Sequence, residues 1–177
     1  MRIFILLAIL CLPLFPLQAF AGSAGDLQIG VRGGTENNKS NLDEDYHAAE
    51  VYLLKVLPWS LLLAEQAALF SRFDFGATYL TGAGEKGGML AAGADLVLGL
   101  WDGGVEFEIG FRPTWLFDHT YGDDNFGGGM QFTSHAGLAI GWKGLVLSYR
   151  IQHTSNAGLY DNNPGLNLHM IGLGYRF

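Results

Sequence analysis

The sequence predicts an all-β fold, an eight-stranded antiparallel transmembrane β-barrel. Two observations lead to this fold class. Apolar and polar residues alternate with a period of two in segments of about ten residues, the length that a tilted strand needs to cross a bilayer. Although 49% of the residues are hydrophobic and 26 are glycine, no uninterrupted apolar run of helical length follows the N-terminal leader. The apolar surface is therefore spread over strands.

The first 21 residues have the pattern of a secretory signal peptide. One positive charge, Arg2, precedes an apolar run at residues 3–17, and small residues lead to a cleavage site after Ala21. Residues 22–177 then form a single domain. Because the one cysteine, Cys11, lies in the leader, we expect neither a disulfide nor a cysteine metal site in the mature chain.

Turn-forming residues divide the remainder into eight segments that we expect to be strands: residues 26–35, 46–57, 66–80, 88–101, 104–117, 129–142, 145–156 and 166–177. In the third segment the alternating sets are Phe73, Phe75 and Tyr79 against Arg72, Asp74 and Thr78. In the fourth they are Leu96, Leu98 and Leu100 against Asp95 and two glycines. In the fifth they are Val105, Phe107, Ile109 and Phe111 against Glu106, Glu108 and Arg112. Each strand thus has one apolar face and one polar face.

The apolar face is expected to point to lipid and the polar face into the barrel. The inward charges would then neutralise one another in a filled lumen, because an unpaired charge there is costly. They are Glu50, Arg72, Asp74, Asp95, Glu106, Glu108 and Arg112. A soluble barrel of the lipocalin type, with its apolar face inward, is the alternative, but its aromatic residues would crowd one narrow interior.

Connections of two kinds alternate along the chain. Asp102-Gly103 and Lys143-Gly144 are tight turns, whereas the connections at 36–45, 81–87, 118–128 and 157–165 are longer and polar. Short periplasmic turns and longer extracellular loops are typical of bacterial outer-membrane barrels, and the terminal GLGYRF fits the same class. We expect the polar residues of the third loop to be solvated, with a divalent-cation site as the alternative: Asp118, His119, Asp123 and Asp124. A net charge of −7 argues against a nucleic-acid partner.

Polar side chains interrupt the outward face of the seventh and eighth segments. His153 and Ser155 have the parity of the lipid-facing residues, and Asn167 has the outward parity of the next strand. A hairpin at 157–165 would bring Asn167 level with His153. At about 3.3 Å per residue and a tilt near 40°, Ser155 lies roughly 25 Å up the barrel, where acyl chains meet headgroups.

These residue types fit a serine esterase. A serine attacks only after a base removes its proton, and histidine suits this role near neutral pH. Asn167 would hold the imidazole. The Asn156 side chain and the backbone N–H groups of Ala157 and Gly158 would stabilise the oxyanion. The alternative explanation is a set of interfacial side chains that hydrogen-bond lipid headgroups.

The stretches HTSNAGL at 153–159 and NNPGLN at 162–167 resemble the PagL-type lipid A 3-O-deacylase family, and YHAAEVYLLKVLPW at 46–59 is consistent with it. Members of that family are outer-membrane barrels that hydrolyse the ester-linked acyl chain at the 3-position of lipid A. The resemblance implies His153 as base, Ser155 as nucleophile and Asn156 as an oxyanion-hole donor. It also implies an acidic residue about a dozen positions later, where this chain has Asn167.

Asn167 is therefore the expected third member, with Asp161 in the hairpin as the alternative and a two-residue site as a further one. We expect a carboxylic ester hydrolase of the outer membrane that modifies lipopolysaccharide and uses neither a cofactor nor a metal. Lipid A is the expected substrate, and a homodimer is left open. A non-catalytic structural or adhesive barrel and a phospholipase-type acyl hydrolase are the rival functions.

Overall fold

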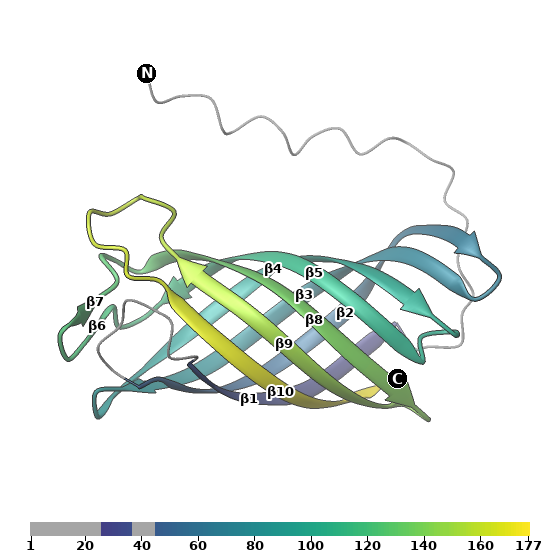
Figure 1. Cartoon of the computed structure of the whole chain (residues 1–177), viewed down its shortest axis with the longest axis horizontal. Coiled ribbons are helices and arrows are strands. Elements are labelled where there is room, and N and C mark those ends of the chain that lie inside the picture. The colour runs from purple at the N-terminus through teal and green to yellow at the C-terminus, as the bar shows by residue number, and fades with distance from the viewer. Residues whose placement is uncertain (1–25, 37–44) are drawn as a thin grey trace, which may run out of the picture.

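The computed structural model describes residues 26–36 and 45–177, and the expected signal peptide lies outside them. Eight antiparallel strands close into a barrel in the order β1-β10-β9-β8-β5-β4-β3-β2 (Figure 1). They are β1 Leu27–Glu36, β2 His47–Ala64, β3 Ala67–Gly82, β4 Glu85–Leu100, β5 Val105–Leu116, β8 Met130–Trp142, β9 Leu145–Ser155 and β10 Leu166–Arg176. A small hairpin of β6 Thr120–Tyr121 and β7 Asp124–Asn125 lies between β5 and β8. The predicted barrel is confirmed. Within the described ranges, no helix is long and apolar enough to cross a membrane.

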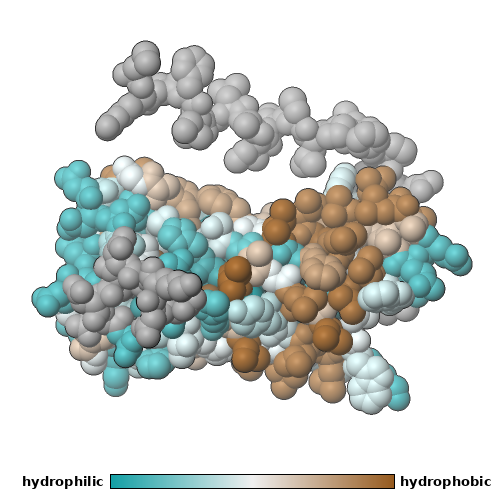
Figure 2. Space-filling model, in the orientation of Figure 1, coloured by the Kyte–Doolittle hydropathy of each residue, from teal (hydrophilic) through white to brown (hydrophobic). Residues whose placement is uncertain are grey.

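The two faces of the strands are those that the period of two predicts. In β5, Glu106 and Arg112 are buried, whereas Phe107 and Ile109 are 48% and 60% exposed. Figure 2 shows hydrophobic side chains gathered in a band toward one end of the barrel, while the end that carries β6 and β7 is hydrophilic. The apolar face therefore meets lipid, and the alternative of a soluble barrel with an apolar interior is wrong.

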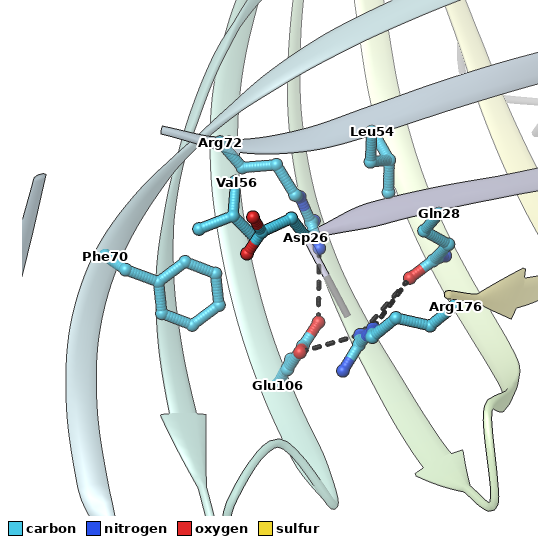
Figure 3. A pocket seen from close by; sticks show the side chains of 8 residues that line it. All are labelled: Asp26, Gln28, Leu54, Val56, Phe70, Arg72, Glu106 and Arg176. Carbon is cyan, nitrogen blue, oxygen red and sulfur yellow. Dashed lines mark hydrogen bonds and ion pairs between the residues drawn. The ribbon is translucent and has the colours of Figure 1, made fainter. Parts of the chain in front are cut away.

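Paired charges fill the lumen. In the described part of the chain, five arginines and five carboxylates form its ion pairs: Arg32, Arg72, Arg112, Arg150 and Arg176 with Glu50, Asp74, Asp95, Glu106 and Glu108. At the short-turn end, Glu106 contacts both Arg72 and Arg176 beside a cavity of about 30 Å³ (Figure 3). Such a volume holds roughly one or two water molecules. The predicted neutralisation is confirmed, and Arg32, Arg150 and Arg176 extend the predicted set.

Two boundaries differ from those predicted. β3 and β4 meet in a two-residue turn at Ala83 and Gly84, with φ of 54° and 75°, so the connection at 81–87 is not a longer loop. Two successive positive φ values are those of a type I′ hairpin. β2 continues to Ala64 because a β-bulge between Val56 and Ser60 accommodates Pro58 without ending the strand.

The loop between β5 and β8 packs over the extracellular end. Tyr46, Tyr121 and Phe126 form an aromatic cluster there, with ring centroids 5.6 to 6.2 Å apart. The Tyr46 hydroxyl donates to Asp124 at 3.0 Å. Asp124 is only 5% exposed, so the expectation that this acid is solvated was wrong. Burial raises the pKa of Tyr121 to about 12. The cluster fixes the Phe126 carbonyl, which contacts the loop of the candidate site.

Candidate active site

The candidate site lies on the outer face of β9 and β10, toward the end with the longer loops (Figure 1). His153 and Asn167 are directly paired in the antiparallel register. Ser155, the last residue of β9, lies on the same face two residues further along. His153 is exposed, and Ser155 and Asn167 are partly exposed. The strands thus bring the three sequence-predicted residues together in one patch on the lipid-facing side.

A hydrogen bond joins two of these residues. Nδ1 of His153 lies 2.8 Å from Oδ1 of Asn167. A carbonyl oxygen only accepts hydrogen bonds, so the proton of the neutral imidazole is on Nδ1. The lone pair is then on Nε2, on the other side of the ring. Asn167 therefore favours the tautomer in which Nε2 is able to act as a base.

Ser155 is a neighbour of His153 without being hydrogen-bonded to it. Residues i and i+2 of a strand lie on one face about 7 Å apart along the backbone. Among the described residues, the Ser155 hydroxyl makes no hydrogen bond with the imidazole. Contacts between a nucleophile and its base are often long in a substrate-free site and shorten when substrate binds.

Gly165 packs against the imidazole ring of His153, a contact that the sequence did not predict. A Cβ at this position would stand 2.9 Å from Cε1 of His153, closer than real Cβ contacts occur. Gly165 is buried and has a φ of +75°, in the left-handed region that favours glycine. The Pro164-Gly165 dipeptide is a turn signal, but the ring that packs on it is visible only in the fold.

Asn156 is completely buried, and its amide belongs to the loop. Its Nδ2 donates to the carbonyls of Phe126 at 3.1 Å and Asn162 at 2.6 Å. Its Oδ1 accepts from the Gly158 N–H at 2.8 Å, and its own N–H donates to Asn163 Oδ1 at 3.0 Å. The donor roles predicted for the Asn156 side chain and the Gly158 N–H do not fit this geometry, because these protons are engaged within the protein. Asn156 instead shapes the loop.

Ala157 retains the remaining predicted donor. Its φ is +52°, and its N–H has no hydrogen-bond partner among the described residues. It is exposed and follows Ser155 by two residues. Asp161, the alternative third member, is also exposed and makes no contact with His153 within the described part of the chain. Of the two alternatives, Asn167 is the residue that holds the ring.

His169 belongs to a separate polar pair on the same face. Its Nδ1 is hydrogen-bonded to the hydroxyl of Tyr149, and the two ring centroids are 5.9 Å apart. The contact with Tyr149 gives His169 a packing role on this face. Tyr149 was not foreseen as its partner because the two residues are diagonal across the strands.

Three potential metal ligands converge inside the lumen, away from this patch. Ligand atoms of Asp74, Asp95 and His135 lie within 4.8 Å of one another. The Arg150 guanidinium contacts the carboxylates of Asp74 and Asp95 at 2.7 and 3.8 Å. His135 Nε2 also lies 3.0 Å from Asp95 Oδ1. Because an organic cation already bridges the two carboxylates, we interpret the group as part of the ion-pair network.

A lipid-facing barrel wall with these residues at its outer rim defines a class, the ester hydrolases of the outer membrane. The family model described as lipid A 3-O-deacylase (PagL) matches residues 29–176, so the chain belongs to this family. The crystal structure of the outer membrane enzyme PagL matches with a TM-score of 0.73 and 19% identity, over 85% of this chain and 99% of that chain. At this identity the likeness shows the fold. No curated protein matches significantly.

Proposed function

We propose that this lipid A 3-O-deacylase cleaves its ester through a covalent intermediate, with Ser155 as nucleophile, His153 as general base and Asn167 as the residue that orients His153. The hydrogen bond between His153 and Asn167 on the lipid-facing side carries the proposal. Packing against lipid chains does not explain this polar pair, because lipid chains form no hydrogen bonds with it. Catalysis does explain it, because a general base needs a fixed tautomer.

In the first half of the reaction, Nε2 of His153 takes the Ser155 hydroxyl proton while the serine oxygen attacks the acyl carbonyl. The oxyanion of the tetrahedral intermediate accepts a hydrogen bond from the Ala157 N–H. The bond between the carbonyl carbon and the sugar 3-oxygen then breaks. His153 returns the proton to the departing sugar hydroxyl, and Ser155 keeps the acyl group.

In the second half, His153 deprotonates a water molecule that attacks the acyl-enzyme. Collapse of the second tetrahedral intermediate releases a 3-hydroxy fatty acid, and the proton on His153 returns to Ser155. The orientation of the site supports this sequence, because the ester reaches Ser155 while the lipid stays in its leaflet. Asn156 and Gly158 contribute by holding the loop that carries Ala157.

Mass spectrometry of lipid A from cells that express the protein tests the assignment. We expect loss of one ester-linked acyl chain with wild type and retention of that chain with Ser155→Ala and His153→Ala. Ser71→Ala is the matched control, because Ser71 is a partly exposed serine on another strand, β3. Wild-type deacylation by either site variant would overturn the roles of Ser155 and His153.

Two narrower questions have their own measurements. Purified lipopolysaccharide and phospholipid, offered side by side, distinguish the deacylase from a phospholipase-type hydrolase, and we expect turnover of lipopolysaccharide alone. A homodimer stays a prediction. Chemical crosslinking of the protein in outer membranes checks it through a band of twice the monomer mass.

A further inference from the structure

Most donors around Ser155 are engaged within the loop. The Nδ2 protons of Asn156 bind two backbone carbonyls, and the Gly158 N–H binds Asn156 Oδ1. The Leu159 N–H donates to the Asn156 carbonyl at 3.0 Å. Of the backbone N–H groups of residues 156–159, this leaves that of Ala157 for the oxyanion. Ester hydrolases commonly aim more than one donor at this charge, including serine hydroxyls.

Ser134 supplies an unengaged hydroxyl from the neighbouring strand. It lies in β8, directly opposite His153, and it is exposed on the outer face. Direct antiparallel partners have Cβ atoms about 4.5–5.5 Å apart, and diagonal neighbours have Cα atoms about 7–8 Å apart. Ser134 is thus the direct neighbour of His153 and the diagonal neighbour of Ser155. Among the described residues its hydroxyl makes no hydrogen bond.

The other strand hydroxyls near the site are engaged. Thr133 and Thr154 point into the barrel, where their hydroxyls are 2.7 Å apart. The Tyr149 hydroxyl is bound to His169. Apart from Ser155 itself, Ser134 is therefore the strand hydroxyl at this site that is available to a substrate.

The surroundings of Ser134 on the side away from His153 are apolar. Its other direct partner is Phe111 on β5, and Phe111 stacks on Phe132 with ring centroids 5.7 Å apart. Phe132 is in turn the direct partner of Ser155. Lipid chains over these rings leave the hydroxyl unpaired, and water exclusion strengthens a hydrogen bond to a developing charge. A bound ester would provide the acceptor that Ser134 lacks.

We propose that Ser134 is a further catalytic residue, whose hydroxyl donates a hydrogen bond to the acyl carbonyl oxygen as that atom becomes an oxyanion. This inference rests on the proposed role of Ser155 as the nucleophile. Ser134 supplies a donor on the β8 side of the scissile carbonyl, and the Ala157 N–H supplies a second donor from the loop after Ser155. Because this hydrogen bond strengthens with the charge, it acts on kcat more than on KM.

Steady-state hydrolysis of purified lipid A in detergent micelles tests the proposal with four proteins. Loss of one oxyanion-hole donor costs about 10²–10³ in kcat. The Ser134 hydroxyl rotates freely, so ordering it offsets part of its contribution. We expect Ser134→Ala to lower kcat by about 10- to 100-fold with KM within about twofold. Ser134→Thr keeps the hydroxyl and should recover most of the rate. Ser71→Ala is the control for removing a lipid-facing serine.

A micellar p-nitrophenyl ester serves as a second substrate, because an oxyanion donor acts on every ester. An equal fall in kcat on both substrates supports the proposal. A wild-type kcat in Ser134→Ala, or a rise in KM alone, overturns it, and so does a defect confined to lipid A. Inactive wild type with both esters contradicts the proposed function itself. Both assignments are overturned if Ser134→Ala loses as much activity as Ser155→Ala and the wild-type protein forms its acyl-enzyme on Ser134.

Discussion

Asn167 holds His153 from the adjacent strand, with Oδ1 and Nδ1 2.8 Å apart. The amide differs from a carboxylate because its other end, Nδ2, donates hydrogen bonds. If the amide turns over, Nδ2 meets Nδ1 and the imidazole proton moves to Nε2. In that tautomer His153 is unable to accept the serine proton. A carboxylate has no donating end, so it permits only the productive tautomer and also stabilises the imidazolium.

Asn167→Asp should therefore raise kcat by at least about tenfold, because replacing the acid by an amide costs about 10⁴ in a serine protease triad. Asn167→Ala should lower kcat by about tenfold, since the ring loses its partner. Steady-state hydrolysis of lipid A in micelles measures both changes. Asp161→Asn is the control and should have wild-type activity. A faster Asp161→Asn, or an Asn167→Asp variant no faster than wild type, would show that another residue limits the base.

Gly165→Ala should displace the His153 ring, because the new Cβ would stand 2.9 Å from Cε1. We expect kcat to fall by more than about tenfold, since small misplacements of catalytic groups cost up to about 10² in rate. Gly84→Ala is a matched control: its φ is also +75°, and a Cβ there has nothing within 4 Å. Both variants place an alanine at the same positive φ. Equal activity of the two variants would mean that the contact with His153 has no effect on catalysis.

Asn156→Asp should destabilise the protein. A carboxylate is unable to donate to the carbonyls of Phe126 and Asn162, which lie 3.1 and 2.6 Å from Nδ2. Buried acceptors left unpaired cost about 1–3 kcal/mol each. Urea unfolding in micelles should show a lower free energy of unfolding, whereas Asn162→Asp, with its backbone carbonyl unchanged, should resemble wild type. A stable but inactive Asn156→Asp variant would instead favour the oxyanion-donor role.

Glu36 should make stability depend on pH. Burial, together with the carboxylates of Asp124 and Asp45, raises the pKa of Glu36 from 4.5 to about 7 at the extracellular end of β1. Between these values the folded protein binds more protons at Glu36 than the unfolded chain does. The free energy of unfolding therefore falls as the pH rises through this window.

Thermal unfolding in micelles at several pH values from 4.5 to 7.5 checks this dependence. Glu36→Gln removes the titration, so its Tm should decline less than that of wild type as the pH rises. Glu65→Gln, which replaces an exposed carboxylate at the opposite end, should keep the wild-type dependence. Parallel curves for wild type and Glu36→Gln would contradict the assignment to Glu36.

The features that the sequence predicted well depend on strand parity. The period of two places Glu106 in the lumen and His153 outside, and a hairpin fixes the pairing of His153 with Asn167. Hydrogen bonds to distant backbone carbonyls produce no periodic pattern in the sequence. The hydrogen bond from Asn156 to the Phe126 carbonyl was therefore not predictable from the sequence. Ser134 was not predicted as a site residue for a related reason: its proximity to His153 depends on the register between β8 and β9.

Local signals explain the misplaced boundaries. The glycine-rich connection at 81–87 has the composition of a longer loop, although its Ala83-Gly84 pair makes a two-residue turn. Pro58 reads as a strand end, although a bulge accommodates it. In both cases pairing with the neighbouring strand over many residues outweighs the local preference.

The charges in the lumen cancel, so the lumen contributes little to the net charge of this protein. Five guanidinium groups face five carboxylates among the described lumen residues, so the interior is close to electroneutral. The net charge of −7 is therefore carried by residues other than these ten. Lipid A headgroups carry phosphates of the same sign. The exposed loop carboxylates Asp118, Asp123 and Asp161 repel these phosphates, and dissolved ions screen this repulsion.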